Sequence, residues 1–138
     1  MTPERWLVLF GIALWVGSLF LPAIEGSGFP TLAGLDVLWQ GASGWRNGVV
    51  AWYANPVLGL AFVACWIGRY RFALAAGALG LALGLSSFTA GTVAESAGRS
   101  VPPFGFAIGF YIWLGAFLAA LAGGLAGIYK VSRRPQSP

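Results

Sequence analysis

The sequence predicts an all-α membrane protein with four transmembrane helices and both termini in the cytoplasm. The first indication is composition: 58% of the 138 residues are hydrophobic and 9% are charged, whereas roughly a quarter of the residues in a soluble domain are charged. The second is that the charges leave four uncharged windows, at residues 6–24, 47–68, 72–94 and 100–129. A helix needs about 20 apolar residues to cross ~30 Å of hydrocarbon. Each window can therefore hold one span.

The third indication is the distribution of Lys and Arg, because cytoplasmic flanks of membrane helices retain positive charge. With four spans, most cations fall on the side of the two termini, namely Arg5, Arg69, Arg71, Lys130, Arg133 and Arg134. Arg46 and Arg99 fall on the other side. We therefore expect a multi-pass protein with both termini inside. Nucleic-acid binding is not expected, because the basic residues flank spans and form no dense patch.

We expect the first span over residues 6–21, ending at Pro22, since helices commonly stop at proline. A long external loop, residues 22–48, follows. Within it, Leu32, Leu35, Leu38 and Trp39 have helical spacing. This pattern fits a short interfacial helix on the outer leaflet. It fits equally a coil anchored among the headgroups by Trp39 and Trp45.

The second span, residues 49–68, contains the segment Trp52–Pro56. Asn is a good N-cap and Pro is favoured at the first helical position. These preferences predict a helix that starts at Pro56 after a separate turn, capped by Asn55. The alternative is one kinked helix that begins near residue 48. In both cases the backbone breaks near Asn55.

A broken membrane helix can mark an ion or substrate site, because freed carbonyls and a helix N-terminus can bind a ligand. Here the break is flanked by Trp52 and Tyr53, which we expect to act as interface anchors. Aromatic anchors place the break near the outer interface, which favours simple capping.

We expect the third span over residues 72–90 and the fourth over 104–129, with an external loop at 91–103 and a cytoplasmic tail at 130–138. A tight basic link joins spans two and three into a hairpin. Small residues spaced about one helical turn apart let helices approach closely in lipid. They are Gly77, Gly80 and Gly84 in the third span, and Gly115, Ala119, Gly123 and Gly127 in the fourth. We expect these positions to pack against a helix of this chain, of a second copy or of another protein.

The chain offers little reactive chemistry. It has no His and a single Cys, so His ligands and intrachain thiolate clusters are excluded. We expect no cofactor, no metal and no catalytic residue. Proton-coupled transporters carry a carboxylate within a span, and all four acids here lie at span ends or in loops. Ser86, Ser87 and Thr89 either line a small polar cavity or, as we prefer, bond to their own helix carbonyls.

Three segments carry a resemblance: the end of the first span at Leu21–Ala23, the segment Trp52–Pro56, and the aromatic start of the fourth span at Phe110–Gly115. With these, the chain resembles a loose set of short four-span proteins of the bacterial inner membrane. The resemblance covers most of the chain and implies the fold and the location, but no activity.

These observations predict a non-catalytic accessory or structural subunit that packs in lipid against other membrane subunits or against itself through its small-residue faces. The alternative is a small oligomeric channel or transporter with a site near the Asn55–Pro56 break and Ser86–Thr89. An enzyme ranks third.

Overall fold

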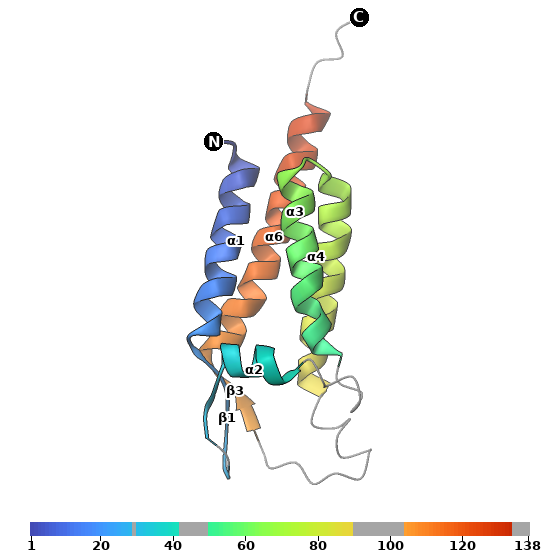
Figure 1. The fold of residues 1–138 in the computed structure, drawn as a ribbon. Coiled ribbons are helices and arrows are strands. Elements are labelled where there is room, and N and C mark those ends of the chain that lie inside the picture. The colour runs from blue at the N-terminus through green and yellow to red at the C-terminus, as the bar shows by residue number, and fades with distance from the viewer. Residues whose placement is uncertain (29, 42–49, 90–103, 134–138) are drawn as a thin grey trace, which may run out of the picture.

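The computed structural model describes residues 1–28, 30–41, 50–89 and 104–133. Its longest helices run side by side and form what we call the bundle (Figure 1). They are α1 (Pro3–Leu19), α3 (Ala54–Trp66), α4 (Tyr70–Leu85) and α6 (Ile108–Ser132). The prediction of a mostly helical chain is confirmed. Within the described ranges, Tyr70–Thr89 and Ile108–Ser132 are long and apolar enough to cross a membrane.

A cap covers the end of the bundle opposite the start of α1 (Figure 1). It consists of helix α2 (Gly34–Gly41) and an antiparallel sheet with strand order β2-β1-β3. The strands are β1 (Pro22–Gly26), β2 (Leu32–Ala33) and β3 (Phe104–Phe106). Two 3-10 turns, η2 (Ala51–Tyr53) and η3 (Ser86–Thr89), adjoin α3 and α4 at this end.

The sheet corrects two sequence predictions. Residues 22–48 are expected as a loop, but the first part of this segment forms β1 and β2. For the residues that follow, the sequence leaves a short helix and a coil as alternatives, and the structure has the helix, α2. The fourth span was expected to start at residue 104, which is wrong, because α6 begins at Ile108. Phe104–Phe106 instead pairs with β1, with Ile24 opposite Phe106. That pairing satisfies backbone groups that a helix would otherwise have bonded internally.

Other boundaries differ by a few residues. Helix α1 includes Glu4 and Arg5 and ends at Leu19 rather than at residue 21. Some of the predicted features lie outside the described residues: Trp45, Arg46, Arg99, the predicted loop at 91–103 and residues 134–138 of the tail, which include Arg134.

Small residues of α6 lie against its neighbours in the same chain. Ala119 is buried, and Gly123 lies close to Cys65 Sγ of α3 and to the backbone of α1. Gly115 faces Leu14 of α1, and Gly127 faces the ring of Tyr70. This side of α6 is therefore occupied by helices of its own chain.

The small residues of α4 receive large side chains of α6. A Cβ atom added to Gly77 would lie 3.1 Å from Leu121, and one added to Gly84 would lie 3.2 Å from Trp113. Gly80 faces Phe117, which is fully buried. The absence of a side chain at these glycines lets α4 and α6 approach closely.

This packing predicts that Gly80→Ala destabilises the protein. The added Cβ would lie 2.6 Å from Cε1 of Phe117, whose ring is fully buried, so the ring or the backbone must shift. We expect the free energy of unfolding in detergent to fall by about 2 kcal/mol, as for overpacked cores. Gly59→Ala in α3 is the matched control, because nothing lies within 4 Å of its added Cβ. That variant should be neutral or slightly more stable, and equal losses in both variants would contradict the packing.

Candidate functional site: a polar hub and a pocket beneath the cap

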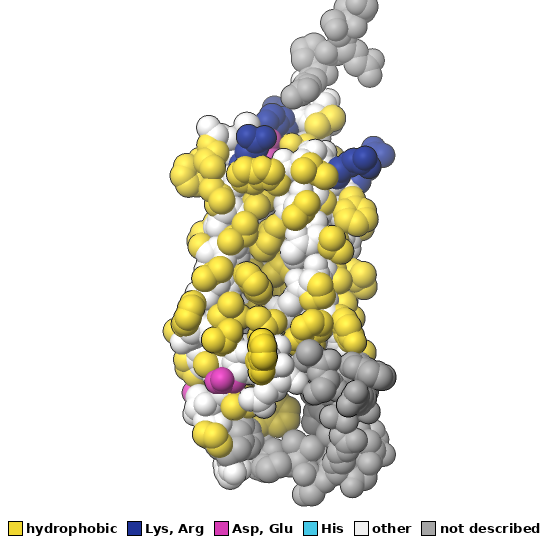
Figure 2. Space-filling model, in the orientation of Figure 1, with side chains coloured by type: hydrophobic (Ala, Val, Ile, Leu, Met, Phe, Trp, Pro, Cys, Tyr) yellow, Lys and Arg dark blue, Asp and Glu magenta, His cyan; other side chains and the backbone are white. Residues whose placement is uncertain are grey.

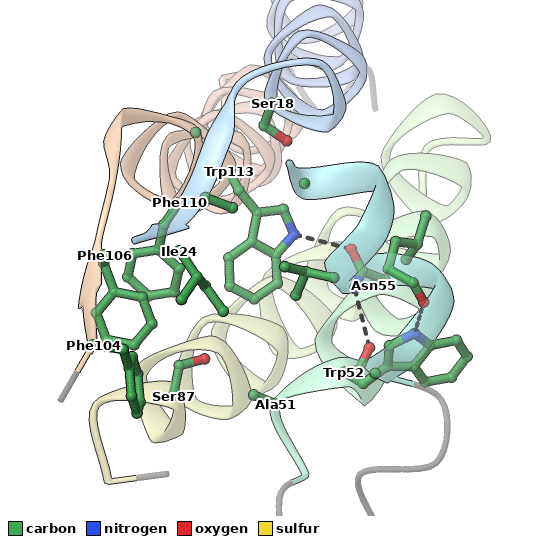
Figure 3. A pocket seen from close by; sticks show the side chains of 16 residues that line it. Ser18, Ile24, Ala51, Trp52, Asn55, Ser87, Phe104, Phe106, Phe110 and Trp113 are labelled. Carbon is green, nitrogen blue, oxygen red and sulfur yellow. Dashed lines mark hydrogen bonds between the residues drawn. The ribbon is translucent and has the colours of Figure 1, made fainter. Parts of the chain in front are cut away.

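The side-chain amide of Asn55 joins three elements at the capped end of the bundle, and Figure 3 shows its bonds to Trp113 and Trp52. Its Oδ1 accepts hydrogen bonds from Trp15 Nε1 of α1, at 3.0 Å, and from Trp113 Nε1 of α6, at 2.9 Å. Its Nδ2 donates to the backbone oxygen of Trp52 at 3.2 Å. Because an indole N–H can only donate, the two tryptophans fix which end of the amide is the oxygen. We call Asn55, Trp15 and Trp113 the amide hub.

The capping role predicted for Asn55 is wrong. Helix α3 begins at Ala54, two residues before the expected start, and its N-cap Tyr53 makes no side-chain cap bond. The expected break near Asn55 is also wrong, because η2 runs directly into α3 and Asn55 is the second residue of that helix. Pro56 is the third helical residue, where a backbone N–H has no partner within the helix. Asn55 is thus free to bond sideways to other helices.

A pocket of about 200 Å³ lies between the end of the bundle and the cap, beside the amide hub (Figure 3). Its wall includes residues from every bundle helix except α4, and from β1, α2, η2, η3 and β3. The lining side chains that the structure describes are mostly aliphatic or aromatic, and none of them is charged. An apolar pocket with a few polar groups is the usual form of a small-molecule site.

One wall of the pocket is aromatic. The rings of Phe106 and Phe110 stack with centroids 4.0 Å apart and planes inclined by 22°. Phe88 of η3 meets both edge-on, at 5.0 Å and 5.4 Å, and Trp113 continues the row beyond Phe110 at 5.7 Å. The stack forms because β3 leads almost directly into α6, which places residues 106 and 110 on the same side.

The hydroxyl groups near the pocket differ in whether they are bonded. Ser86 Oγ donates to Leu83 O and Thr89 Oγ1 donates to Ser86 O, at 2.6 Å and 2.8 Å, as the backbone-bonding alternative predicted. Ser18, which lines the pocket, bonds Trp15 O. Ser87 also lines the pocket, and among the described residues its hydroxyl has no hydrogen-bond partner. The polar-cavity alternative therefore fits Ser87 alone of the three predicted residues.

The predicted interface anchors have different surroundings. Trp52 Nε1 donates to Leu38 O at 2.7 Å, so its ring ties η2 to α2. Trp39 is 86% exposed on α2, and Tyr53 is partly exposed and meets Trp52 edge-on. Trp39 and Tyr53 thus have the exposure that an anchor needs, whereas Trp52 holds the cap to the bundle.

A second polar cluster, not found in the sequence, lies at the opposite end. Glu4 of α1 is 3% exposed, and its Oε1 accepts bonds from Lys130 Nζ at 2.7 Å and from Tyr70 Oη at 3.3 Å. Burial acts to raise the pKa of Glu4, but the hydrogen bond from Lys130, hydrogen bonds at the start of the helix and the charge of Lys130 together outweigh it and bring that pKa to about 2. Glu4 is therefore ionised at neutral pH and links the start of α1 to the end of α6.

The described residues contain no group of three or more His, Cys, Asp or Glu side chains placed to hold a metal ion. What the pocket geometry can do is enclose a small uncharged group beside one available hydroxyl. Comparisons of the chain with models of known families, with curated proteins and with solved structures find no match.

The amide hub predicts that Asn55→Leu destabilises the protein by about 3 kcal/mol. A leucine of similar size leaves two indole N–H groups without their acceptor inside the bundle, and each unsatisfied donor costs about 1–3 kcal/mol. Unfolding in detergent, followed by tryptophan fluorescence, measures the loss. A double-mutant cycle with Trp15→Phe is the sharper test. The double variant leaves one indole N–H without an acceptor, whereas Asn55→Leu alone leaves two. Its cost should be less than the sum of the single costs, and strict additivity would argue against a shared acceptor.

The Glu4 cluster predicts acid sensitivity. Since the pKa of Glu4 is about 2 in the folded protein and 4.5 for an ordinary carboxyl, its ionised form stabilises the fold above pH about 4.5 and that contribution is lost as the pH falls towards 2. The melting temperature should therefore fall between about pH 5 and pH 3, and Glu4→Gln should reduce this slope. Glu25→Gln, at an exposed position in β1, is the control and should keep it. An unchanged slope in Glu4→Gln would exclude this origin.

Proposed function

We propose that this chain is a non-catalytic integral membrane protein that crosses a bacterial inner membrane four times, with both termini in the cytoplasm, and serves as an accessory or structural subunit. The observation that carries the proposal is the apolar outer surface of the bundle. In helix Tyr70–Thr89, only 28% of the most apolar window is buried within the chain. The remaining apolar side chains face outward and need an apolar environment.

Every helix of the bundle contributes to this surface. Large hydrophobic side chains are more than half exposed on all of them, for example Phe10 on α1, Val63 on α3, Leu79 on α4 and Leu118 on α6. Figure 2 shows hydrophobic side chains along the length of the bundle, between a cationic end and the cap. Soluble monomers rarely expose continuous apolar patches of this extent. A lipid bilayer would cover this surface with apolar acyl chains.

The charges support the orientation. The described cations are Arg5, Arg69, Arg71, Lys130 and Arg133, and they lie at the end of the bundle where α1 begins (Figure 2). Glu25 and Asp36 belong to the cap. By the positive-inside rule, the cationic end faces the cytoplasm and the cap faces outward.

The short α3 constrains how the bundle would sit in the bilayer. The run Ala51–Trp66 extends roughly 24 Å at 1.5 Å per residue, which is less than ~30 Å of hydrocarbon. A local thinning of the bilayer or a cap lying within the outer interface removes this mismatch. Exposed Leu35 and Trp39 on α2 favour the second arrangement.

The interior favours a structural role over conduction. Asn55, Ser18, Ser86, Thr89 and Glu4 are each hydrogen-bonded within the chain, so their polar groups are used in holding the fold. The small residues of α4 and α6 are likewise occupied by neighbouring helices. A partner subunit would therefore meet the outward Leu, Val and Phe side chains rather than the glycine faces.

One observation favours the alternative, a small oligomeric channel or transporter with a site near Asn55. The pocket beneath the cap includes Asn55 and the available hydroxyl of Ser87. Conduction would need a continuous path through an oligomer, so flux through liposomes containing the purified protein separates the two functions.

The proposed orientation predicts the labelling of introduced cysteines. In a Cys65→Ala background, Ser27→Cys beside β1 should react with a membrane-impermeant maleimide on intact spheroplasts, because the cap faces outward. Ser132→Cys at the end of α6 should react only after permeabilisation. The reverse pattern would overturn the topology, and labelling of both in intact cells would overturn the membrane crossing.

The accessory role predicts recovery in a larger complex. The chain should be extracted from native membranes in mild detergent through a C-terminal tag, with quantitative mass spectrometry of what accompanies it. Recovery of other membrane subunits at a fixed stoichiometry would support the accessory role. An unrelated four-span protein with the same tag is the control, and the same subunits should not be recovered with it. Recovery alone, with flux in liposomes, would replace it with the channel alternative.

A further inference from the structure

We propose that the pocket beneath the cap binds a neutral, membrane-soluble molecule that carries one aromatic or quinone-like ring with a hydroxyl or carbonyl oxygen. This goes beyond the structural role, and either proposal can fail without the other. Four features of the pocket define the ligand class: its volume, its aromatic wall, the lack of charge among its described lining residues and the position of Ser87.

The volume limits the ligand to about one substituted ring. The pocket measures about 200 Å³, and a buried cavity of ~150 Å³ lined by Leu, Ile and Phe is enough to bind benzene. The pocket therefore accommodates a ring and a few further atoms, and is too small for a whole phospholipid.

The wall favours a planar ring over a flexible chain. Phe104, Phe106, Phe110 and Trp113 all line the pocket, and Figure 3 shows the rings of Phe106, Phe110 and Trp113 along one side. Aromatic side chains pack best against another ring, in offset-stacked or edge-to-face contact. Ile24 of β1 lies beside this wall and adds an aliphatic surface (Figure 3).

None of the described lining residues is charged, which favours a neutral ligand, because a charged group would lose its hydration without a compensating partner among them. The amide hub offers no further acceptor of comparable strength, since both lone pairs of Asn55 Oδ1 are occupied by indole N–H groups. The hydroxyl of Ser87 is available, and it can either donate to a ligand carbonyl or accept from a ligand hydroxyl. One oxygen on the ligand therefore matches the pocket.

The test uses the full-length protein in lipid nanodiscs and a photoreactive probe, 4-(trifluoromethyl-diazirinyl)benzyl alcohol, which has a neutral ring and one hydroxyl. After illumination, mass spectrometry identifies the labelled residues, and excess benzyl alcohol serves as competitor. We expect labelling of pocket residues such as Leu38 and Phe106 that saturates with probe and is displaced by the competitor. Labelling of outward residues such as Leu79 should rise linearly and resist competition. If all labelling is linear and outward-facing, the pocket is not a site for this class.

Three variants assign the binding to the pocket. Ser87→Ala should weaken the apparent affinity by about fivefold, the loss expected for one hydrogen bond. Ser86→Ala is the matched control, because its hydroxyl bonds Leu83 O and does not line the pocket, and it should bind as the parent does. Val37→Phe fills the pocket from α2 and should abolish saturable labelling.

Because Val37→Phe can disturb the cap, its melting temperature is compared with that of the parent. If it unfolds, the pair Ser87→Ala and Ser86→Ala decides alone, since neither changes the packing volume appreciably. Equal affinity in these two variants would overturn the role of Ser87, and saturable labelling that persists in folded Val37→Phe would overturn the site.

Discussion

The arrangement of the helices depends on one requirement, that the indole N–H groups of Trp15 and Trp113 find an acceptor inside an apolar bundle. A polar group without a partner is costly in such surroundings, and costlier still in lipid. One oxygen, Oδ1 of Asn55, accepts from both. It thereby fixes the rotation of α1, α3 and α6 about their axes at the capped end. The amide is held in turn by the backbone of Trp52, so the same residue also sets how η2 enters α3.

Close approach of the backbones makes this shared acceptor possible. Trp113 fits beside Gly84 of α4, and Phe117, one turn further along α6, fits over Gly80. Without these glycines the large side chains of α6 would hold α4 away. At the other end, Gly123 and Gly127 of α6 lie near α1 and Tyr70, where Glu4 and Lys130 form their ion pair. Small residues thus set the spacing along the bundle, and polar contacts at each end set its register.

The sequence revealed those features that depend on local composition. Gaps between charges located the helices, and one-turn spacing identified Gly77, Gly80 and Gly84 as packing positions that do face α6. Features that depend on contacts between distant residues were missed. β3 is three residues long and pairs with β1 from about 80 positions earlier, so its own pattern is too short to indicate a strand. The local sequence at Asn55 predicts a helix cap, whereas the two indole groups that its side chain binds lie 40 and 58 positions away. The sequence places Glu4 at the end of a span, and nothing near it indicates that Lys130 would cover it.

The amide hub and the Glu4 ion pair have a common feature with a consequence for biogenesis: each joins the first helix of the chain to the last. While α6 is still being synthesised, Trp15 and Asn55 can meet, but Glu4 lacks its cation and the pocket lacks its aromatic wall. Only arrival of the final helix neutralises the buried carboxylate and supplies the second indole. A chain that stops short of α6 would therefore leave the Glu4 carboxylate without its cation and the pocket without its aromatic wall.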